Sequence, residues 1–273
     1  MNDEGCVMSG RLEGKVAFIT GAGSGIARAA AHIFTREGAQ VILAELDATR
    51  GEKVTQRVID GGGDAMFVRT DVTSPDSVQA ALTEGVKAYG RLDVLFNCAG
   101  GSVAEDKAVT DVDMAVWDHT MNLDLKGPFL CCRYAIPHMA TSGGGAIINV
   151  SSVVALKGSF PGHIYTAAKG GIISFTQALA GRYWRDNIRA NAIAPGLILS
   201  ERILARSGLD PDLPADGQIE RAKEANQKLF DPRHPFSAGV PEDIANVALF
   251  LASDESRMVN GAVIPAEGGL SAY

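Results

Sequence analysis

Short runs of β-branched and apolar residues alternate with longer segments of helical period through the first hundred residues of the chain. The runs KVAFIT, VILAE, AMFVR and LDVLF are separated by three such helical segments, of which the first is SGIARAAAHIFTREG. Parallel strands need a crossover helix between them, and helices then cover both faces of the sheet. The alternation therefore predicts β-α-β units whose strands are buried on both sides.

The same alternation continues toward the end of the chain. The runs GAIINVSS and IRANAIAP flank a helical segment from about Tyr165 to Trp184, and the helix PEDIANVALFLAS, opened by Pro241, precedes the last short run, GAVIPAEGG. We therefore predict an α/β fold, a single-domain Rossmann-type doubly wound parallel sheet of about seven strands with helices on both faces.

The chain shows no internal linker. It has 273 residues, of which 46% are hydrophobic, and this is enough for one large domain. We expect a flexible tail over residues 1–10 and one catalytic domain over 11–273. The stretch 197–237 breaks the rhythm with four prolines in charged sequence, and it is expected to form a lid over a substrate.

Charge and composition argue against several classes of partner. The chain carries 25 Lys and Arg against 32 Asp and Glu, a formal charge of −7, which does not favour binding to nucleic acid or to anionic membranes. The four cysteines and five histidines form no metal-ligand spacing, and no stretch approaches the about 18 apolar residues of a membrane span. We expect a cytoplasmic protein that holds no metal.

The segment TGAGSGIA, residues 20–27, follows the first predicted strand and opens the first predicted helix. Its glycines, Gly21, Gly23 and Gly25, with Ser24 and Ile26 beside them, permit backbone N–H groups to approach a phosphate at the positive end of a helix dipole. The spacing is neither G-x-G-x-x-G nor that of a P-loop. The turn predicts a dinucleotide site, with a tight turn that binds no ligand as the alternative.

An acidic residue, Glu45, ends the second predicted strand, 20 residues after Gly25. A carboxylate there can accept hydrogen bonds from an adenosine ribose and repels a 2′-phosphate. Neither Ser24 nor Leu46 supplies a basic side chain, so we expect NAD to be preferred over NADP. The alternative is a solvated glutamate at a strand end.

Tyr165 and Lys169 stand four residues apart in YTAAK, so that a helix brings their side chains to one face. An ammonium near a phenol stabilises the phenolate, which we expect to lower the pKa of Tyr165 toward the range of a general acid and base. A simple contact on an exposed helix surface is the alternative.

Together these residues resemble the short-chain dehydrogenase/reductase family, in the family's order and over roughly residues 12–273. The resemblance rests on the glycine turn with Thr20 and Ala27, on the pair Asp71 and Val72, on NCAG at 97–100, on Asn122, Ser152, Tyr165 and Lys169, and on the segment Pro195, Gly196, Ile198 and Ser200. Three positions depart from the family's pattern, namely Ala27 for a glycine, Cys98 for an asparagine and Ser200 for a threonine.

The resemblance implies an oxidoreductase that interconverts a secondary alcohol and a ketone. Tyr165 would be the general acid and base, and Ser152 would hydrogen-bond the substrate oxygen. Lys169 would lower the pKa of the tyrosine and hydrogen-bond the nicotinamide ribose. Asn122 would hold a water that links Lys169 to solvent. The implied cofactor contacts are Gly21, Gly23, Ser24, Gly25, Ile26, Glu45, Asp71, Val72, Asn97, Ala99, Gly100, Tyr165, Lys169, Pro195, Gly196, Ile198 and Ser200. Ser151, on the other side of an extended strand, is expected to be structural.

Other functions remain open at this point. A noncatalytic NAD-binding sensor could keep the same fold, since a fold alone does not establish chemistry. An NADP-dependent 3-oxoacyl-thioester reductase is a further alternative, whereas the chain length disfavours an extended epimerase and the place of Ser152 disfavours an enoyl reductase. By resemblance we also expect a homotetramer and a small-molecule alcohol or ketone as substrate, with Gly101, Ser102, Phe160, Leu197 and the lid as the residues that could shape its cleft.

Overall fold

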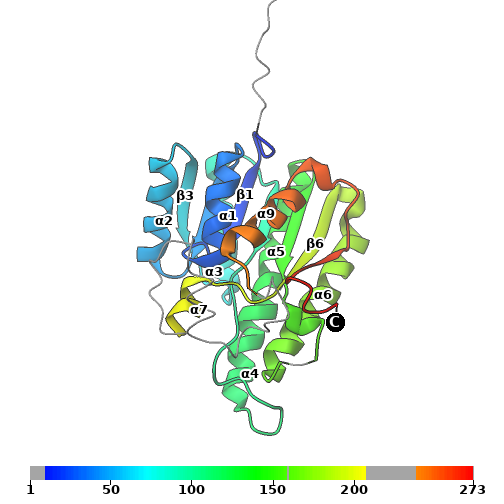
Figure 1. Ribbon diagram of the computed structural model, residues 1–273. Helices are drawn as coiled ribbons and strands as arrows, with labels where there is room; N and C mark the ends of the chain where they lie inside the picture. The colour runs from blue at the N-terminus through cyan, green and yellow to red at the C-terminus, as the bar shows by residue number, and fades with distance from the viewer. Residues whose placement is uncertain (1–9, 159, 207–237, 273) are drawn as a thin grey trace, which may run out of the picture.

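The computed structural model describes residues 10–158, 160–206 and 238–272 (Figure 1). At its centre is one seven-stranded sheet in which all neighbouring strands are parallel, in the order β3-β2-β1-β4-β5-β6-β7. The strands are β1 (Val16–Thr20), β2 (Gln40–Glu45), β3 (Asp64–Arg69), β4 (Val94–Asn97), β5 (Gly145–Val150), β6 (Ile188–Pro195) and β7 (Val263–Ala266). The predicted doubly wound parallel sheet is confirmed.

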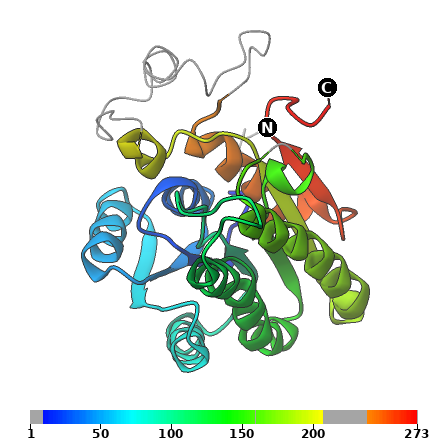
Figure 2. The ribbon, with the colours of Figure 1, turned by 90° about the horizontal axis from the view of Figure 1, so that it is seen from below.

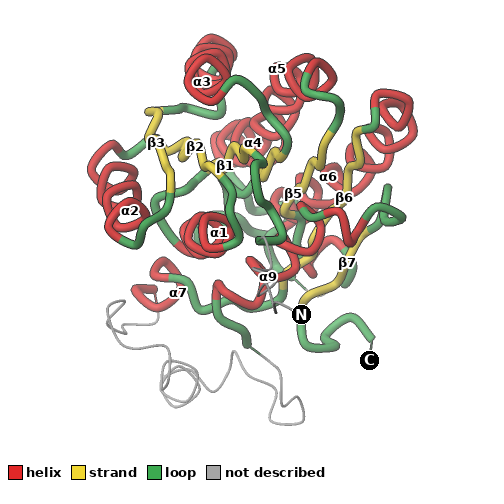
Figure 3. The backbone as a smooth tube through the Cα atoms, turned by 90° about the horizontal axis from the view of Figure 1, so that it is seen from above, coloured by secondary structure: helices red, strands yellow, loops and turns green. Residues whose placement is uncertain are grey.

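Helices lie on both faces of this sheet. Figure 3 shows α1, α2 and α9 on one side of the strands and α3, α5 and α6 on the other. The longer helices are α1 (Gly25–Arg36), α2 (Ala48–Asp60), α3 (Pro75–Tyr89), α4 (Met114–Met121), α5 (Gly127–Thr141), α6 (His163–Tyr183), α7 (Glu201–Arg206) and α9 (Pro241–Ala252). Short helical turns are η1 (Asn122–Lys126), η2 (Val153–Ala155), η3 (Trp184–Asp186) and η5 (Asp254–Ser256).

The core consists of two apolar layers, one on each side of the sheet. Successive residues of a strand point to opposite faces, and in the fully buried β1 the pair Ala17 and Ile19 packs under α1 and α9 while Val16 and Phe18 pack under α3 and α5. Burial of each larger side chain contributes roughly 1.5–3 kcal/mol to folding. The strands are therefore buried on both sides, as the sequence pattern predicts.

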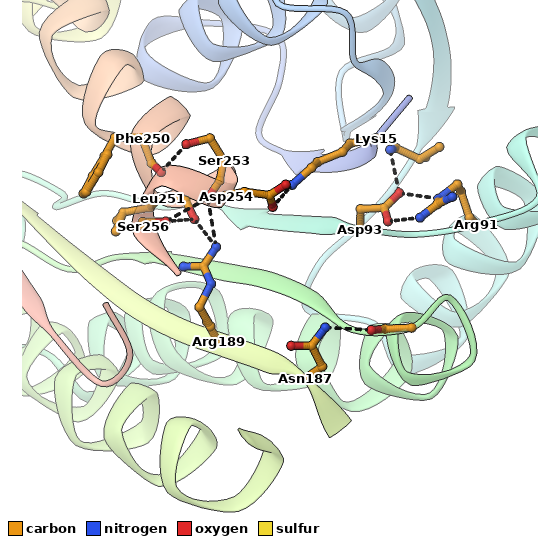
Figure 4. Close-up of polar contacts among 12 residues, drawn as sticks. Lys15, Arg91, Asp93, Asn187, Arg189, Phe250, Leu251, Ser253, Asp254 and Ser256 are labelled. Carbon is orange, nitrogen blue, oxygen red and sulfur yellow. Dashed lines mark hydrogen bonds and ion pairs between the residues drawn. The ribbon is translucent and has the colours of Figure 1, made fainter. Parts of the chain in front are cut away.

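Polar contacts tie the helices to the sheet at the end where the strands begin (Figure 4). Lys15 forms an ion pair of 2.5 Å with Asp254, just after α9. The Arg189 guanidinium on β6 donates hydrogen bonds to the carbonyl oxygens of Leu251 and Ser253, at 3.0 and 3.2 Å. These contacts fix the end of α9, whose other end faces the opposite, functional edge of the sheet.

Two element boundaries differ from those expected. The fifth strand ends at Val150, so that Ser151 and Ser152 lie in the turn beyond it. The helix expected from about Tyr165 begins at His163, because the Asp106 carboxylate accepts hydrogen bonds from the N–H groups of Ile164 and Tyr165, at 3.2 and 2.8 Å, and so satisfies the first turn.

A π-helical turn interrupts the long helical segment formed by α4 and α5, of which α5 packs against β4 and β5. The turn η1 joins α4 to α5 directly, and its residues Asn122 to Lys126 read NLDLK. A π-helical turn carries one extra residue relative to an α-helical turn, which redirects the side chains within it and is frequent at functional sites. Nothing in the hydrophobic periodicity of this segment predicts it.

The order of the strands also places the ligand crevice. The chain proceeds to one side from β1 through β2 and β3 and to the other side from β4 onward, so that β1 and β4 flank the switch point. Ligands of such sheets bind beyond the carboxyl ends of the strands at this point.

Helices α4 and α7 lie at one end of the molecule in Figure 1. Within the described ranges, none of the helices combines the length and the apolar character that crossing a bilayer requires.

Candidate active site

The glycine turn between β1 and α1 is shaped to receive an anion. Gly21 and Gly25 adopt positive φ angles of 70° and 54°, which L side chains rarely adopt. A Cβ on Gly21 would lie 2.9 Å from the Ala99 Cα, and one on Gly25 would lie 3.2 Å from the Ser200 Cβ. The turn thus packs closely against the two segments expected to border a cofactor, and the N–H of Gly25 opens the helix. This cradle fits a pyrophosphate.

Thr20 joins the glycine turn to the NCAG segment after β4. Its hydroxyl accepts hydrogen bonds from the N–H groups of Cys98 and Ala99, at 3.0 and 3.1 Å. Asn97 is buried, and its amide donates to the Asn149 side chain at 2.8 Å across the neighbouring strands. Asn97 and Ala99 are therefore held against the sheet, with Gly100 following at the rim of the crevice.

Glu45 lies beside the glycine turn. One carboxylate oxygen accepts a hydrogen bond of 3.0 Å from the Gly23 N–H, and the other accepts from the N–H groups of Leu46 and Asp47. The structure also brings in a basic residue that the sequence reasoning missed, because a Cβ on Gly23 would lie 2.8 Å from the Arg50 Cβ. Arg50 is paired with Asp47 at 3.4 Å.

Asp71 and Val72 follow β3, at the same edge of the sheet. The Asp71 carboxylate accepts hydrogen bonds from the Thr73 N–H and hydroxyl, at 2.9 and 2.7 Å, which rigidifies the turn. Val72 is buried and lies against Gly127 at the start of α5.

The segment after β6 crosses over the glycine turn. Gly196 donates to the Ala266 carbonyl at 3.1 Å, and Ile198 forms a β-bridge with Gly239. Ser200 then comes to rest against Gly25, as its distance to a Gly25 Cβ indicates. Pro195, Gly196, Ile198 and Ser200 are thus placed along one side of the crevice.

Helix α7 brings two charged side chains that were not among the expected site residues. Glu201 accepts a hydrogen bond of 2.8 Å from the Gly25 N–H, and the Arg202 guanidinium donates to the Gly100 carbonyl at 3.1 Å and covers Gly101. Figure 2 shows α7 beside the start of α1. The expectation of a lid at 197–237 could have pointed to both residues, although residues 207–237 lie outside the described part of the chain.

Three expected catalytic residues lie close together beyond the end of β5: Ser152 in the turn after β5, and Tyr165 and Lys169 on α6. The Lys169 ammonium is buried, donates a hydrogen bond of 3.0 Å to the Val150 carbonyl, and lies 5.5 Å from the centre of the Tyr165 ring. Ser152 lies close enough to the phenol to lower the pKa of Tyr165, and its hydroxyl also accepts a hydrogen bond of 3.4 Å from the Val154 N–H. Ser151 instead donates to the Lys169 carbonyl at 2.8 Å, which is a structural role.

The pKa of Tyr165 is higher than that of a free tyrosine. Burial of the phenol is the largest cause and raises the pKa, whereas the charge of Lys169 lowers it, as expected. Asp124 raises it again, and Arg202 and the nearby Ser152 lower it. The expected net lowering is therefore wrong for the protein by itself, because desolvation outweighs the effect of the neighbouring ammonium.

The structure places Asp124, rather than Asn122, beside the lysine. Asp124 lies in the π-helical turn, is fully buried, and forms an ion pair of 3.0 Å with the Lys169 Nζ. Asn122 begins the same turn, and among the described residues no hydrogen bond or ion pair joins it to Lys169. A helical period of 3.6 residues does not predict that Asp124 points toward Lys169. The π-helical turn, with its one extra residue, could not be predicted from the sequence.

The expected substrate cleft is described only in part. Phe160 packs on Tyr165 with ring centres 6.1 Å apart, and Leu197 joins a small apolar cluster with Leu199 and Leu204. Over the residues that the structure describes, no group of three or more His, Cys, Asp and Glu side chains is gathered as a metal site.

Comparison with known proteins finds similarity to reductases and dehydrogenases. A family model described as enoyl-(acyl carrier protein) reductase matches residues 21–271. A cis-4-hydroxycyclohexanecarboxylate dehydrogenase of Sinomonas cyclohexanicum is 37% identical, over 94% of this chain and 97% of that protein. A 3-oxoacyl-[acyl-carrier-protein] reductase of Thermotoga maritima is 38% identical, over 95% and 99% of the two chains.

Solved structures agree with the sequence comparisons. The crystal structure of levodione reductase superposes with a TM-score of 0.84 at 28% identity, covering 96% of this chain and 99% of that one. A short-chain type dehydrogenase/reductase from Mycobacterium ulcerans gives a TM-score of 0.83 at 27% identity, with 96% and 91% of the chains covered.

Proposed function

Since the chain belongs to the short-chain dehydrogenase/reductase family of oxidoreductases, we propose that it interconverts a secondary alcohol and a ketone with NAD as cofactor. The observation that carries this proposal is that Ser152 and Lys169 both lie near the Tyr165 phenol, at the end of the sheet that also holds the glycine turn. Two of the relatives are dehydrogenases named for hydroxylated small molecules, cis-4-hydroxycyclohexanecarboxylate and meso-2,3-butanediol.

Each residue of this set has a defined task in alcohol oxidation. Tyr165 takes the hydroxyl proton, and Ser152 holds the substrate oxygen by a hydrogen bond, a contribution of roughly 3 kcal/mol where such a donor is preorganised. Lys169 offsets the charge of the phenolate. When bound, the nicotinamide supplies the acceptor for the hydride that leaves the carbinol carbon. In ketone reduction the phenol returns its proton to the oxygen.

The proposed cofactor contacts lie at the ends of β1, β2, β3, β4 and β6 and on α6. They are the residues expected from the sequence, namely Gly21, Gly23, Ser24, Gly25, Ile26, Glu45, Asp71, Val72, Asn97, Ala99, Gly100, Tyr165, Lys169, Pro195, Gly196, Ile198 and Ser200. The Glu45 carboxylate at Gly23 supports NAD, because it would repel the 2′-phosphate of NADP.

A second candidate is the NADP-dependent reduction of a 3-oxoacyl thioester. The 38% identity to the Thermotoga 3-oxoacyl-[acyl-carrier-protein] reductase favours it, and so does Arg50 near Gly23, whose charge could meet a 2′-phosphate if it left Asp47. Assays with both cofactors, in both directions, separate the two candidates.

We also propose a homotetramer. Large apolar side chains are exposed on the helices near the site, with Met114 and Trp117 on α4 and Phe129 on α5 exposed by 65%, 41% and 46%. Large exposed apolar side chains on these helices are candidates for burial between subunits. Light scattering on the purified protein measures the assembly.

The experiment that tests the proposed function is an absorbance assay of NAD reduction with a panel of secondary alcohols, and of NADH oxidation with the matching ketones. We expect turnover with NAD that exceeds turnover with NADP at least about tenfold in kcat/KM. Binding of NAD without turnover of any substrate would instead support a noncatalytic sensor. Turnover of 3-oxoacyl thioesters with NADPH alone would support the second candidate.

A further inference from the structure

In the buried ion pair between Asp124 and Lys169, one carboxylate oxygen has two partners and the other has none. The Asp124 Oδ1 contacts the Lys169 Nζ at 3.0 Å and accepts a hydrogen bond of 2.8 Å from the Gly101 N–H. The Oδ2 of the same carboxylate is buried and has no hydrogen-bond partner. The exposed fractions of the two side chains are 0% for Asp124 and 4% for Lys169.

The surrounding backbone is adapted to this carboxylate. Gly100 has a φ of 138°, and a Cβ there would lie 2.3 Å from the Asp124 Oδ1. The π-helical turn brings Asp124 inward between α4 and α5. A buried carboxylate is costly to desolvate, and its removal from a buried pair leaves an uncompensated charge. Several local features thus converge on keeping one negative charge at this place.

The position of that charge matters because of what lies on the other side of the lysine. The Lys169 ammonium lies between the Asp124 carboxylate and the Tyr165 ring, 3.0 Å from the first and 5.5 Å from the centre of the second. One of its N–H bonds is used by the Val150 carbonyl. The ammonium therefore shares its charge between a carboxylate and a phenol.

We propose that Asp124 is a positioning residue of the reaction: it anchors the Lys169 ammonium beside Tyr165, and its negative charge sets the pH at which the phenol gives up its proton. This inference rests on the proposed function. Asp124 acts through Lys169 and need not touch substrate or cofactor.

The electrostatics around Tyr165 agree with this role. Asp124 raises the pKa of Tyr165 and also the pKa of Lys169, so the lysine stays protonated while its effect on the phenol is reduced. The charged groups that act on Tyr165 are Lys169, Asp124 and Arg202, and the Asp106 carboxylate accepts from the Tyr165 N–H. The Cys98 thiol interacts with Lys169, and His163 lies two residues before Tyr165 on the same helix. Of these, Asp124 is the carboxylate that contacts the lysine.

Replacement by asparagine tests the charge while keeping the shape. In Asp124→Asn the side-chain oxygen can still accept hydrogen bonds from Gly101 and Lys169, but the negative charge is gone. The matched control is Asp118→Asn, which removes the same charge from an exposed position of α4. If Asp124→Asn does not fold, Asp124→Ser carries the same prediction, because it also lacks the negative charge and leaves a small polar side chain.

The first readout is the pH dependence of kcat/KM for alcohol oxidation, which rises as Tyr165 loses its proton. Removal of the charge lowers the pKa of the phenol, so we expect this rise to move to lower pH by at least about half a unit in Asp124→Asn. We expect it to move by less than about 0.2 units in Asp118→Asn, whose charge is screened by solvent. A profile in Asp124→Asn that matches the wild type overturns the inference, while turnover itself leaves the proposed function standing.

The second readout needs neither turnover nor cofactor. Tyrosine labelled with ¹³C at the ring carbon that bears the hydroxyl reports ionisation by NMR, and the Tyr165→Phe variant identifies the signal of Tyr165. We expect this signal to begin its shift at lower pH in Asp124→Asn than in the wild type. Identical titration of the two proteins contradicts the inference even if the wild type turns over no alcohol, an outcome that would separately contradict the proposed function.

Discussion

The Glu201 carboxylate accepts a hydrogen bond of 2.8 Å from the backbone N–H of Gly25, at the first residue of α1. Arg28, one turn further along α1, forms an ion pair with the same carboxylate. The N-terminus of a helix attracts anions through its free N–H groups and its dipole. Glu201 therefore holds the place that the proposed function gives to the pyrophosphate.

Replacement of Glu201 by alanine should strengthen NAD binding. The variant frees the Gly25 N–H and the Arg28 guanidinium and removes a negative charge, and together these changes are expected to lower the Kd about fivefold. Isothermal titration of NAD into the protein measures it. Glu242→Ala, at an exposed position of α9, is the control and should leave the Kd unchanged. Weaker binding in Glu201→Ala would mean that the carboxylate supports the cofactor instead of competing with it.

Replacement of Glu45 by alanine should relax the cofactor preference. The variant removes the carboxylate held at the Gly23 N–H and leaves Arg50 nearby, so the ratio of kcat/KM for NAD to that for NADP is expected to fall at least about tenfold. Glu52→Ala, exposed on α2, controls for the loss of one charge in the same region. An unchanged ratio in Glu45→Ala would remove this role for Glu45.

Three cysteines should resist alkylation in the folded protein. Burial raises the pKa of Cys98 and of Cys131 to about 12 each and raises that of Cys132 as well. At pH 8 a thiol of pKa about 12 is ionised in only about one molecule in ten thousand. In a Cys6→Ser protein, iodoacetamide at pH 8 should label the folded form at least about 100-fold more slowly than the urea-unfolded form. Rapid labelling of Cys131 or Cys132, located by peptide mapping, would contradict their burial, and Cys98, which is partly exposed, should label faster than these two.

The raised pKa values of these thiols also make the free energy of unfolding depend on pH. The unfolded chain loses thiol protons near pH 8.5, whereas the folded chain keeps them until about pH 12. The contribution of these thiols to the free energy of unfolding is thus fully present below about pH 8.5 and is lost as the pH rises toward 12. Urea unfolding between pH 8 and pH 10 should show a decline that a Cys131→Ala protein shows less strongly.

Asp93 should matter for stability and little for activity, because it directly precedes β4, at the end of the sheet where the strands begin and opposite the proposed site. Figure 4 shows its contact with Arg91. Its carboxylate accepts hydrogen bonds from the Val16 N–H at 2.9 Å and from the Arg91 guanidinium at 2.8 and 2.6 Å. Asp93→Ala leaves a buried N–H of β1 without a partner, at a cost of about 2 kcal/mol. Asp93→Asn keeps an acceptor and should lose less than half as much. Urea denaturation compares them, and equal losses would show that the charge, not the hydrogen bond to Val16, is what counts.

Much of the fold could be predicted from the sequence, because the signals were local and mutually consistent. The strand Val16–Thr20 is a nearly continuous apolar run and Ile188–Pro195 is mostly apolar, and such runs between helical segments leave few alternatives to a parallel sheet. Helix ends were harder. The start of α6 depends on Asp106, a residue 57 positions before His163 in the chain, and no local pattern reveals that contact.

The site shows the same division. The glycine turn, Ser152, Tyr165 and Lys169 could be proposed because their order and spacing are specific. Glu201 and Arg202 fall within the expected lid, but their contacts with Gly25 and Gly100 follow only from the three-dimensional path of the chain after β6. The ion pair of Asp124 with Lys169 could not be foreseen, because the π-helical turn that buries Asp124 leaves no periodic signal in NLDLK. The water-holding role expected for Asn122 stays a prediction. The direction of the Tyr165 pKa depends on burial, which a sequence pattern does not measure.

The central claim is that the Tyr165 phenol transfers the proton in an NAD-dependent reaction, and the Tyr165→Phe variant tests it most directly. The measurement is kcat/KM for the best alcohol substrate, together with the Kd of NAD, in the variant and the wild type. The account predicts that kcat/KM falls at least about 100-fold while the Kd changes less than about threefold, because the ring remains and only the hydroxyl is lost. A variant that retains turnover within about tenfold of the wild type would contradict the claim.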